Sequence, residues 1–307
     1  MIPLTPDQVL AEIRNGRSLA EAELSYINLQ DARLSDADFS GAFLRGANFS
    51  YVLGDRANFT QATLTLANFY RSSLMGAVLA GATLVRSRLE QANLRGVYAP
   101  NAHLHGAILD GAQVQNAVLD DADLQEASAQ DTNFRGSSLV RANLSTSNCS
   151  RASFSHCNLR HCYGYAAALA GTSFEQADLR QANLRQAVLV GANFTTANLT
   201  NATLRGADLE HAILTHAQMD WVSFRAAYLI YTNLFNASLV GAHFDGAVLI
   251  GTNFGNADLR RAEFHDAAFA QVNFEGACVD GANFYNAQGL TTEQRNWLIH
   301  HGAIGFA

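Results

Sequence analysis

A bulky apolar residue returns every five positions from Leu19 to Phe284, without one insertion or deletion. Of these 54 positions, 31 are leucine and 15 are phenylalanine. Two residues before each bulky position lies a small one, which is alanine at 38 of 53 positions from Ala22 to Ala282. A five-residue period fits neither the period of about 3.6 of a helix nor that of about 2 of a long strand. The pattern therefore predicts a repeat architecture of short sides and corners.

Within each repeat, the order of residues indicates one extended side. In Ala-Asn-Phe at 47–49 and Ala-Asp-Leu at 207–209, the outer two residues are apolar and the middle one is polar, as in a three-residue extended segment. The next two positions are rich in Gly, Asp, Ser, Gln and Arg, which suits a corner. Each pentapeptide is therefore predicted to form one side of a coil.

Phenylalanine spacing indicates how many sides a coil has, because equivalent residues of successive coils stack. Among the 15 phenylalanines at bulky positions, nine pairs are 20 residues apart, two pairs are 15 apart and one pair is 25 apart. Seven pairs at a spacing of 10 show that the residues also alternate. A coil of four sides and 20 residues follows, which gives about 13 coils.

Short runs of the sequence resemble the pentapeptide repeat family. The resemblance is carried by Ala-Asn-Leu-Arg at 92–95, Gly-Ala-Asn-Phe at 191–194 and Gly-Ala-Asp-Leu at 206–209, and the repeats cover about 265 residues. It implies an all-β solenoid, a right-handed quadrilateral β-helix with the Leu/Phe and Ala positions pointing inward. The residue pattern predicts the four sides independently, whereas the handedness comes only from the family.

Short capping helices are expected at both ends, because the unpaired backbone of an open coil invites association. Thr5 and Gln8 form a capping box around a proline, and Gly16 is the expected stop. Thr291 and Gln294 repeat the box near the other end. The predicted organisation is an N-terminal helical cap at 1–17, the repeat β-helix at 18–288 and a C-terminal helical cap at 289–307.

The C-terminal segment has a second interpretation. Trp297, Ile304 and Phe306 supply apolar surface that could form a dimer interface, as the resemblance implies for some relatives. The Gly289-Leu290-Thr291 start of this cap is similar to that of bacterial, especially cyanobacterial, members of the family. Some of those members regulate transcription factors in cell differentiation, which is an analogy and not a derivation.

Composition excludes several classes of protein. Of 307 residues, 49% are apolar, 15% are charged and 3 are proline, which excludes a disordered chain. All 20 basic residues are arginine and the formal charge is −7, so no broad basic surface for nucleic acid is expected. No membrane segment or signal peptide is evident, and the four cysteines form no CxxC pair. We expect a cytoplasmic protein with no direct nucleic-acid or membrane contact.

One cluster has the composition of a metal site, namely Cys149, His156, Cys157, His161 and Cys162. The repeat register places its three cysteines at inward positions and its two histidines at outward corners. Ligands on opposite sides of a wall cannot converge on one ion. We therefore expect buried cysteines and no metal.

Catalytic motifs are absent from the sequence. It holds no GxSxG, HExxH or phosphate loop, and its acidic residues fall at repeat positions that face solvent. A lumen filled by Leu, Phe and Ala also leaves no evident concave site for a small substrate. The prediction is no enzyme, no catalytic residue and no cofactor.

Three inner positions break the pattern, because Gly54, Ala99 and Gly164 stand where a bulky residue is expected. One interpretation is a local bulge or a cavity filled from a neighbouring coil. The other is a surface patch that has been turned toward a partner.

Charge occurs in bands. Six acidic residues and no base lie between Asp110 and Asp131, followed by four arginines and no acid between Arg135 and Arg160. Neighbouring coils could neutralise each other, or the acidic belt 110–131 could form part of a polar docking surface. The resemblance also implies an alternative function, a DNA mimic that binds a type II topoisomerase such as gyrase. A mimic needs a continuous acidic face, which 20 arginines interrupt here.

The most informative surface signal is apolar. In 20-residue coils, the outward residues Val188 and Val190 share one face with four later residues, and Asp208 and Glu210 interrupt the column. The four later residues are Tyr228, Ile230, Val248 and Ile250. Scattered Val, Ile and Tyr would only favour strands, but six on one face indicate more. The hypothesised partner-binding patch adds a corner residue and one residue of the next side to those four: Tyr228, Ile230, Tyr231, Phe235, Val248 and Ile250.

These observations predict a non-catalytic protein–protein interaction or regulatory scaffold. Its partner would be a protein of unknown identity, and a homodimer through the C-terminal cap or the apolar face stays open. The topoisomerase-binding DNA mimic is the alternative.

Overall fold

Each five-residue repeat folds as one extended side followed by a tight corner, in a computed structural model that describes residues 4–306. The N–H of Leu24 donates to the carbonyl of Phe43 at 2.8 Å, and the N–H of Phe43 returns to the carbonyl of Ala22 at 2.9 Å. Parallel bridges join Glu23 to Phe43 and continue along each unit with the same 20-residue step. Four sides therefore make one coil, as the phenylalanine spacing predicts.

The corners have one conformation throughout. From residue 21 to residue 286, every fifth residue has a positive φ between +52° and +72°. The N–H of Ala22 closes the first such corner on the carbonyl of Leu19 at 3.2 Å, as in a type II turn. The first corner residue needs another acceptor, which Asn48 supplies to the N–H of Ser50 at 3.1 Å. This Asx contact explains why Asn or Asp so often precedes the bulky residue.

The core is made of stacked side chains from successive coils. Phe134 and Phe154 stack with ring centroids 4.7 Å apart, and so do Phe244 and Phe264. Most small inner positions that carry a hydroxyl satisfy it on the backbone, as where Thr132 donates to the carbonyl of Leu109 at 2.7 Å, but the buried Ser87 hydroxyl has no partner among the described residues. The interior is therefore packed and free of unpaired threonine hydroxyls at such positions.

The three breaks leave the register unchanged. A Cβ added to Gly54 would lie 3.1 Å from Leu74 Cδ2, and one added to Gly164 would lie 2.8 Å from Leu184 Cδ2. The leucine of the next coil thus fills the space at both glycines, which confirms that interpretation. Ala99 instead borders a small apolar cavity of about 10 Å³.

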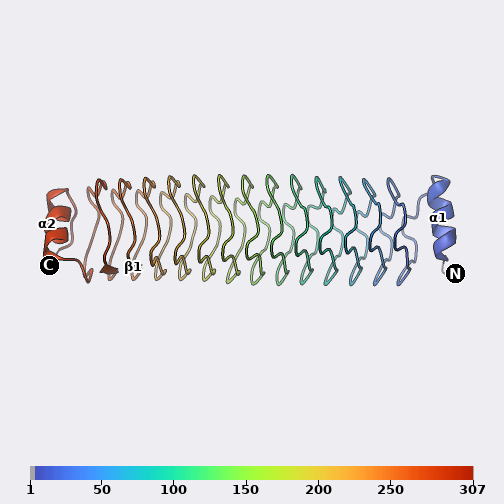
Figure 1. Ribbon diagram of the computed structural model, residues 1–307, viewed down its shortest axis with the longest axis horizontal. Helices are drawn as coiled ribbons and strands as arrows, with labels where there is room; N and C mark the ends of the chain where they lie inside the picture. The colour runs from blue at the N-terminus through green and yellow to red at the C-terminus, as the bar shows by residue number, and fades with distance from the viewer. Residues whose placement is uncertain (1–3, 307) are drawn as a thin grey trace. The chain divides into compact units, whose positions relative to one another are not determined.

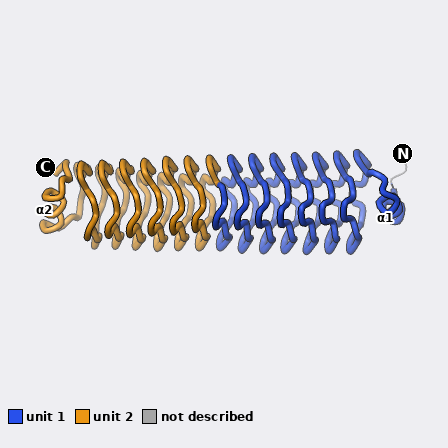
Figure 2. The backbone as a smooth tube through the Cα atoms, turned by 90° about the horizontal axis from the view of Figure 1, so that it is seen from above, with its two compact units in different colours: residues 1–158 blue, residues 159–307 orange. Residues whose placement is uncertain are grey.

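The chain forms two compact units, residues 1–158 and 159–307, each a stack of coils (Figure 2). Unit 1 begins with helix α1, Pro6–Arg14 (Figure 1). Unit 2 contains strands β1, Val248–Ile250, and β2, Ala268–Ala270, which pair in parallel, and ends with helix α2, Thr292–His300. No helix of residues 4–306 is both long and apolar enough to span a bilayer.

Both capping helices begin at the predicted residues. Thr5 accepts from the N–H of Gln8 at 3.3 Å, while the Gln8 side chain accepts from the N–H of Thr5 at 2.8 Å. Thr291 and Gln294 make the same reciprocal box for α2. The predicted caps also include residues 1–3 and 307, which lie outside the described residues.

The residues after α2 continue one side of the last coil. The N–H of Phe284 donates to the carbonyl of Ile304 at 2.8 Å, and the ring of Phe306 stacks on Phe284 at 5.4 Å. Gln294 Nε2 also donates to the carbonyl of Val272 at 2.9 Å. Phe306 is thus engaged within the chain, whereas Ile304 stays 54% exposed. The dimer through this cap stays a prediction.

Candidate interaction surface

One outward surface of unit 2 gathers five of the six residues of the hypothesised patch. We call it the apolar face and define it by Tyr228, Ile230, Tyr231, Val248 and Ile250. Parallel bridging places Tyr228 beside Val248, and Val248 and Ile250 are the outward ends of β1. Tyr228 is 49% and Tyr231 52% exposed, and the other three residues are half-buried. The surface is therefore contiguous over two coils.

Tyr231 is held rigidly at the corner of this face. Its φ is +52°, and its ring stacks on His211 with centroids 5.4 Å apart and planes 8° apart. The opposite side of the ring lies over Gly251, where an added Cβ would overlap Tyr231 Cδ1. A glycine one coil later is thus what lets this tyrosine lie flat.

Phe235 belongs to a different corner. It lies beyond the next side of the coil, 36% exposed, with its ring edge-on to His216 at 6.5 Å. No ring contact joins it to the five residues of the apolar face among the described residues. Phe235 is therefore at the edge of any surface that includes the other five.

An acidic row interrupts the column toward the start of unit 2. Asp208 pairs in register with Val188 on one side and with Tyr228 on the other. Its carboxylate accepts from the N–H of Glu210 at 3.1 Å. Val188, which is 42% exposed, is thus separated from Tyr228 by one charged coil.

A column of arginines near this face was not predicted from the sequence. Arg185, Arg205 and Arg225 occupy the same corner in three successive coils, the last of which contains Tyr228 and Ile230, and all three are exposed. Arg225 Nε donates to Asp245 Oδ2 at 2.8 Å. In the part of the chain that the structure describes, Arg185 and Arg205 have no acidic partner within 4.0 Å. Their 20-residue spacing is the signal that would have revealed them.

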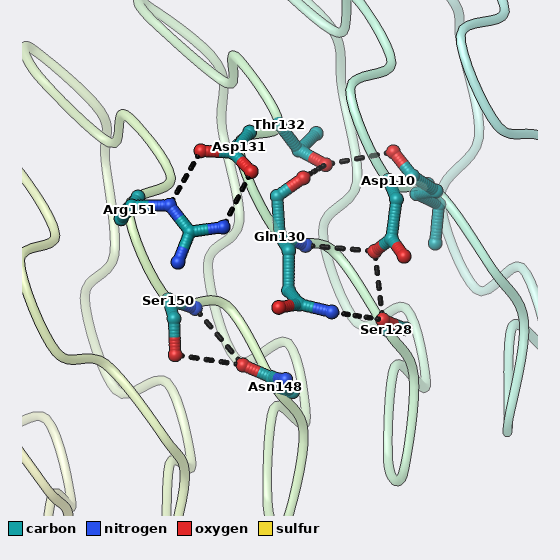
Figure 3. A network of polar contacts seen from close by, with 9 residues as sticks. Asp110, Ser128, Gln130, Asp131, Thr132, Asn148, Ser150 and Arg151 are labelled. Atoms are coloured by element: carbon teal, nitrogen blue, oxygen red, sulfur yellow. Dashed lines mark hydrogen bonds and ion pairs between the residues drawn. The ribbon is translucent and has the colours of Figure 1, made fainter.

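Most acidic residues of the belt in unit 1 are paired with other groups of the same unit. Arg141 donates to both carboxylate oxygens of Asp121 at 2.7 and 2.6 Å. Arg151 does the same to Asp131 at 2.8 and 2.7 Å (Figure 3). These hydrogen bonds lower the pKa of both carboxyl groups. Neutralisation between neighbouring coils is thus confirmed at these two positions.

A different acid of the belt serves the backbone. Asp110 accepts from the Ser128 hydroxyl at 2.7 Å and from the N–H of Gln130 at 2.9 Å (Figure 3). Gln130 is a first corner residue whose own coil offers Ser128 instead of Asn or Asp. The carboxylate of the preceding coil therefore replaces the missing Asx acceptor, and Asp120 repeats the arrangement at Val140.

The predicted inward cysteines are buried. Burial raises the pKa of the Cys149 thiol to about 11 and that of the Cys157 and Cys162 thiols to about 12. Cys157 Sγ also donates to the carbonyl of Phe134 at 2.9 Å, and His156 is exposed at a corner. Across residues 4–306, no three His, Cys, Asp or Glu side chains are grouped so that they could hold a metal ion.

The family comparison agrees with this geometry. The sequence pattern described as pentapeptide repeats matches residues 18–50, 55–91, 87–125, 117–147, 147–186, 165–201, 177–215, 192–229, 227–266 and 249–286. No curated protein matches the chain. The matching segments cover nearly all of the chain between the two capping helices.

Solved structures give weaker likenesses. HetL, a pentapeptide repeat protein involved in heterocyst differentiation regulation in the cyanobacterium Nostoc sp. strain PCC 7120, is 24% identical over 91% of this chain and 96% of its own, with a TM-score of 0.39. QnrB1, a plasmid-mediated fluoroquinolone resistance protein, is 19% identical over 74% and 96%, with a TM-score of 0.26. Rfr23 from the cyanobacterium Cyanothece 51142 is 24% identical over 44% and 90%, with a TM-score of 0.24.

These TM-scores carry no argument about function. The matched repeats and the four-sided coils do establish the fold, a right-handed quadrilateral β-helix typical of structural or interaction scaffolds. The chain belongs to the pentapeptide repeat family.

Proposed function

We propose that the protein is a non-catalytic interaction scaffold and that a partner protein docks on the apolar face of unit 2. The observation that carries the proposal is the exposure of two tyrosines on one rigid surface. Tyr228 and Tyr231 are each about half exposed and stand beside half-buried isoleucines. Tyrosines that anchor an apolar centre are typical of the residues that dominate interface energies.

Rigidity supports the proposal. Tyr231 is fixed between His211 and Gly251 before any partner arrives. β1, which carries Val248 and Ile250, is paired in parallel with β2 of the next coil. Little conformational entropy is lost when such a surface binds, so more of the contact energy is retained as affinity.

The acids of unit 1 give less support to a DNA mimic. Asp121 and Asp131 are each held by an arginine, and Asp110 is engaged with the backbone of the next coil. A surface that imitates nucleic acid needs free negative charge in a continuous row. The topoisomerase alternative therefore enters as an outcome of the experiment.

The test is affinity capture from a lysate of the cells that naturally make the protein, with bound proteins identified by mass spectrometry. Wild type is compared with Ile230→Asp plus Ile250→Asp. The control is Val85→Asp plus Val140→Asp, which alters half-buried residues at the same repeat position in unit 1. Circular dichroism and urea unfolding verify that all three proteins fold.

A partner retained by wild type and the control but lost from the isoleucine variant supports the proposal. Equal recovery of every partner by the isoleucine variant overturns it. Recovery of gyrase or topoisomerase subunits by all three proteins would instead favour the DNA mimic.

A further inference from the structure

The inference concerns the chemistry of the partner and rests on the proposed function. Near the apolar face, unit 2 carries positive charges that have no acidic partner in a neighbouring coil. Arg185 and Arg205 are exposed at the same corner of successive coils, without an acidic partner among the described residues. Stacked arginines at a coil spacing of about 4.8 Å repel each other modestly, so the column costs free energy when the surface is empty.

The arginine column is within reach of anything bound on the apolar face. Arg225 stands three residues before Tyr228, and Arg205 and Arg185 occupy the same corner one and two coils earlier. The next corner residue is small after Arg205 and Arg225, where it is Gly206 and Ala226. No side chain larger than a methyl group therefore separates these two arginines from the outward row that continues into the apolar face. One bound segment can therefore contact both.

A second copy of the chain fits this surface poorly. If a two-fold axis ran across the coils through the middle of the apolar face, Arg205 and Arg185 would face His265 and Tyr285 of the other copy and gain no acidic partner. If it ran along the stack through the middle of the face, Asp208 would face Asp208. Like charges directly opposed at an interface suppress association. The first arrangement leaves these arginines unpaired and the second opposes like charges, so the charge pattern disfavours self-pairing through this face.

Nucleic acid and anionic lipid also fit poorly. Asp208 lies in the middle of the surface between Val188 and Tyr228, and Glu210 follows it in the same coil. Among the described residues, the contact nearest to an ion pair for either acid is between Glu210 and His211, at 3.7 Å. A uniformly anionic ligand would meet these carboxylates and the apolar residues together with the arginines.

We propose that the occupant is a segment of a different protein in which acidic side chains line one edge of an apolar stripe. The acidic edge faces Arg185 and Arg205, and the stripe covers Tyr228, Ile230 and their neighbours. A single basic residue in the stripe answers Asp208 and Glu210. Binding then relieves the repulsion along the arginine column and buries the exposed tyrosines.

The experiment uses three fluorescently labelled synthetic peptides and the full chain. The first has a stripe of Leu and Phe, a row of Glu along one edge and one central Lys. The second exchanges Glu and Lys, and the third replaces the apolar stripe with Ser. Fluorescence anisotropy at low and at moderate salt gives each dissociation constant. We expect the first peptide to bind and to weaken with salt, and the other two to bind at least tenfold more weakly.

Variants of the chain locate the charge contact. Arg185→Gln plus Arg205→Gln should weaken the first peptide by roughly fivefold to tenfold, as expected for two exposed ion pairs. The matched control is Arg45→Gln plus Arg86→Gln, which removes two exposed arginines of unit 1 and changes net charge equally. The control should bind as wild type does.

The outcomes separate this inference from the proposed function. If Ile230→Asp plus Ile250→Asp abolishes binding but the Arg185 and Arg205 variant does not weaken it, the docking face stands and the acidic partner is wrong. If the charge-swapped peptide, anionic phospholipid vesicles or a DNA duplex binds as tightly as the first peptide, the inference is overturned. If no peptide binds, it is overturned as well, while the capture experiment still tests the proposed function independently.

Discussion

Arg151 of unit 1 and Arg205 of unit 2 occupy neighbouring repeat positions but meet opposite surroundings. In unit 1, Arg151 is the second residue of its corner, and Asp131 occupies the same place one coil earlier. Arg151 donates two hydrogen bonds to the Asp131 carboxylate. In unit 2, Arg205 is the first residue of its corner, and the residues one coil away are Arg185 and Arg225. The column in which a charge stands, more than the total of charges, decides whether it is satisfied.

This difference separates charges that hold the coils together from charges left for another molecule. A column of alternating sign neutralises itself, as between Asp121 and Arg141. In a column of like sign, neighbouring charges repel each other modestly. Such a column persists in a sequence only where another favourable interaction offsets this cost. The regular backbone is the same in both units, so the comparison isolates the effect of side chains.

Thiol reactivity offers the largest expected contrast. Cys149 and Cys157 of unit 1 and Cys162 of unit 2 are buried with raised pKa values, whereas Cys278 of unit 2 is exposed. Since the thiolate is the reactive form, only Cys278 should react quickly with a disulfide reagent near neutral pH, and all four should react in urea. Fast reaction of Cys149 or Cys157 in the native protein would show that unit 1 is more open than its packing indicates.

The corner of the apolar face should respond strongly to a side chain at residue 251. Gly251→Val must displace the ring of Tyr231 and also force a β-branched residue to a φ of +63°. We expect a loss of about 2 to 4 kcal/mol in the free energy of unfolding, measured with urea. Gly191→Val is the control, because it has a φ of +65° and nothing within 4 Å, and it should lose about 1 to 2 kcal/mol. Equal losses would mean that Tyr231 is not fixed by Gly251.

In unit 1, the backbone role of Asp110 should be visible as a smaller effect. Asp110→Ala removes the acceptor of the Ser128 hydroxyl and of the N–H of Gln130. We expect a loss of about 1 to 2 kcal/mol in urea unfolding. Asp31→Ala, at an exposed corner, removes only a contact with Gln30 and should change stability little. A loss at residue 31 as large as that at residue 110 would contradict the assigned role.

The fold could be predicted almost entirely from the sequence because its information is local and periodic. The five-residue period gives the sides, phenylalanine spacing gives their number, and the box of Thr5 and Gln8 gives the start of α1. The same 20-residue folding brought Tyr228 and Val248 together, and the structure pairs them. Each of these inferences needs only residue type and position along the chain.

Contacts that depend on side-chain direction could not be predicted in this way. Asp110 accepts hydrogen bonds from Ser128 and Gln130. These bonds could be predicted only if it were known that the N–H of a first corner residue lacks a backbone acceptor. That the ring of Tyr231 would lie over Gly251 depends equally on the direction of its side chain. The arginine column could have been predicted from the sequence. Net charge and bands of charge along the chain do not reveal it, because its arginines recur only every 20 positions.

The smallest expected effect tests the central comparison directly. Arg151→Gln should lower the urea midpoint near neutral pH, because it removes the hydrogen bonds that lower the pKa of Asp131. A carboxyl group whose pKa is lower in the folded state stabilises the fold above its unfolded pKa of about 3.9, and this stability is lost as pH falls through the folded pKa. The difference between wild type and Arg151→Gln should therefore vanish in strong acid.

Arg205→Gln has no ion pair to lose and should leave the midpoint unchanged, or raise it slightly by relieving repulsion, at every pH. If both variants instead lose stability alike near neutral pH, Arg205 is paired as Arg151 is, and the distinction between the two columns fails.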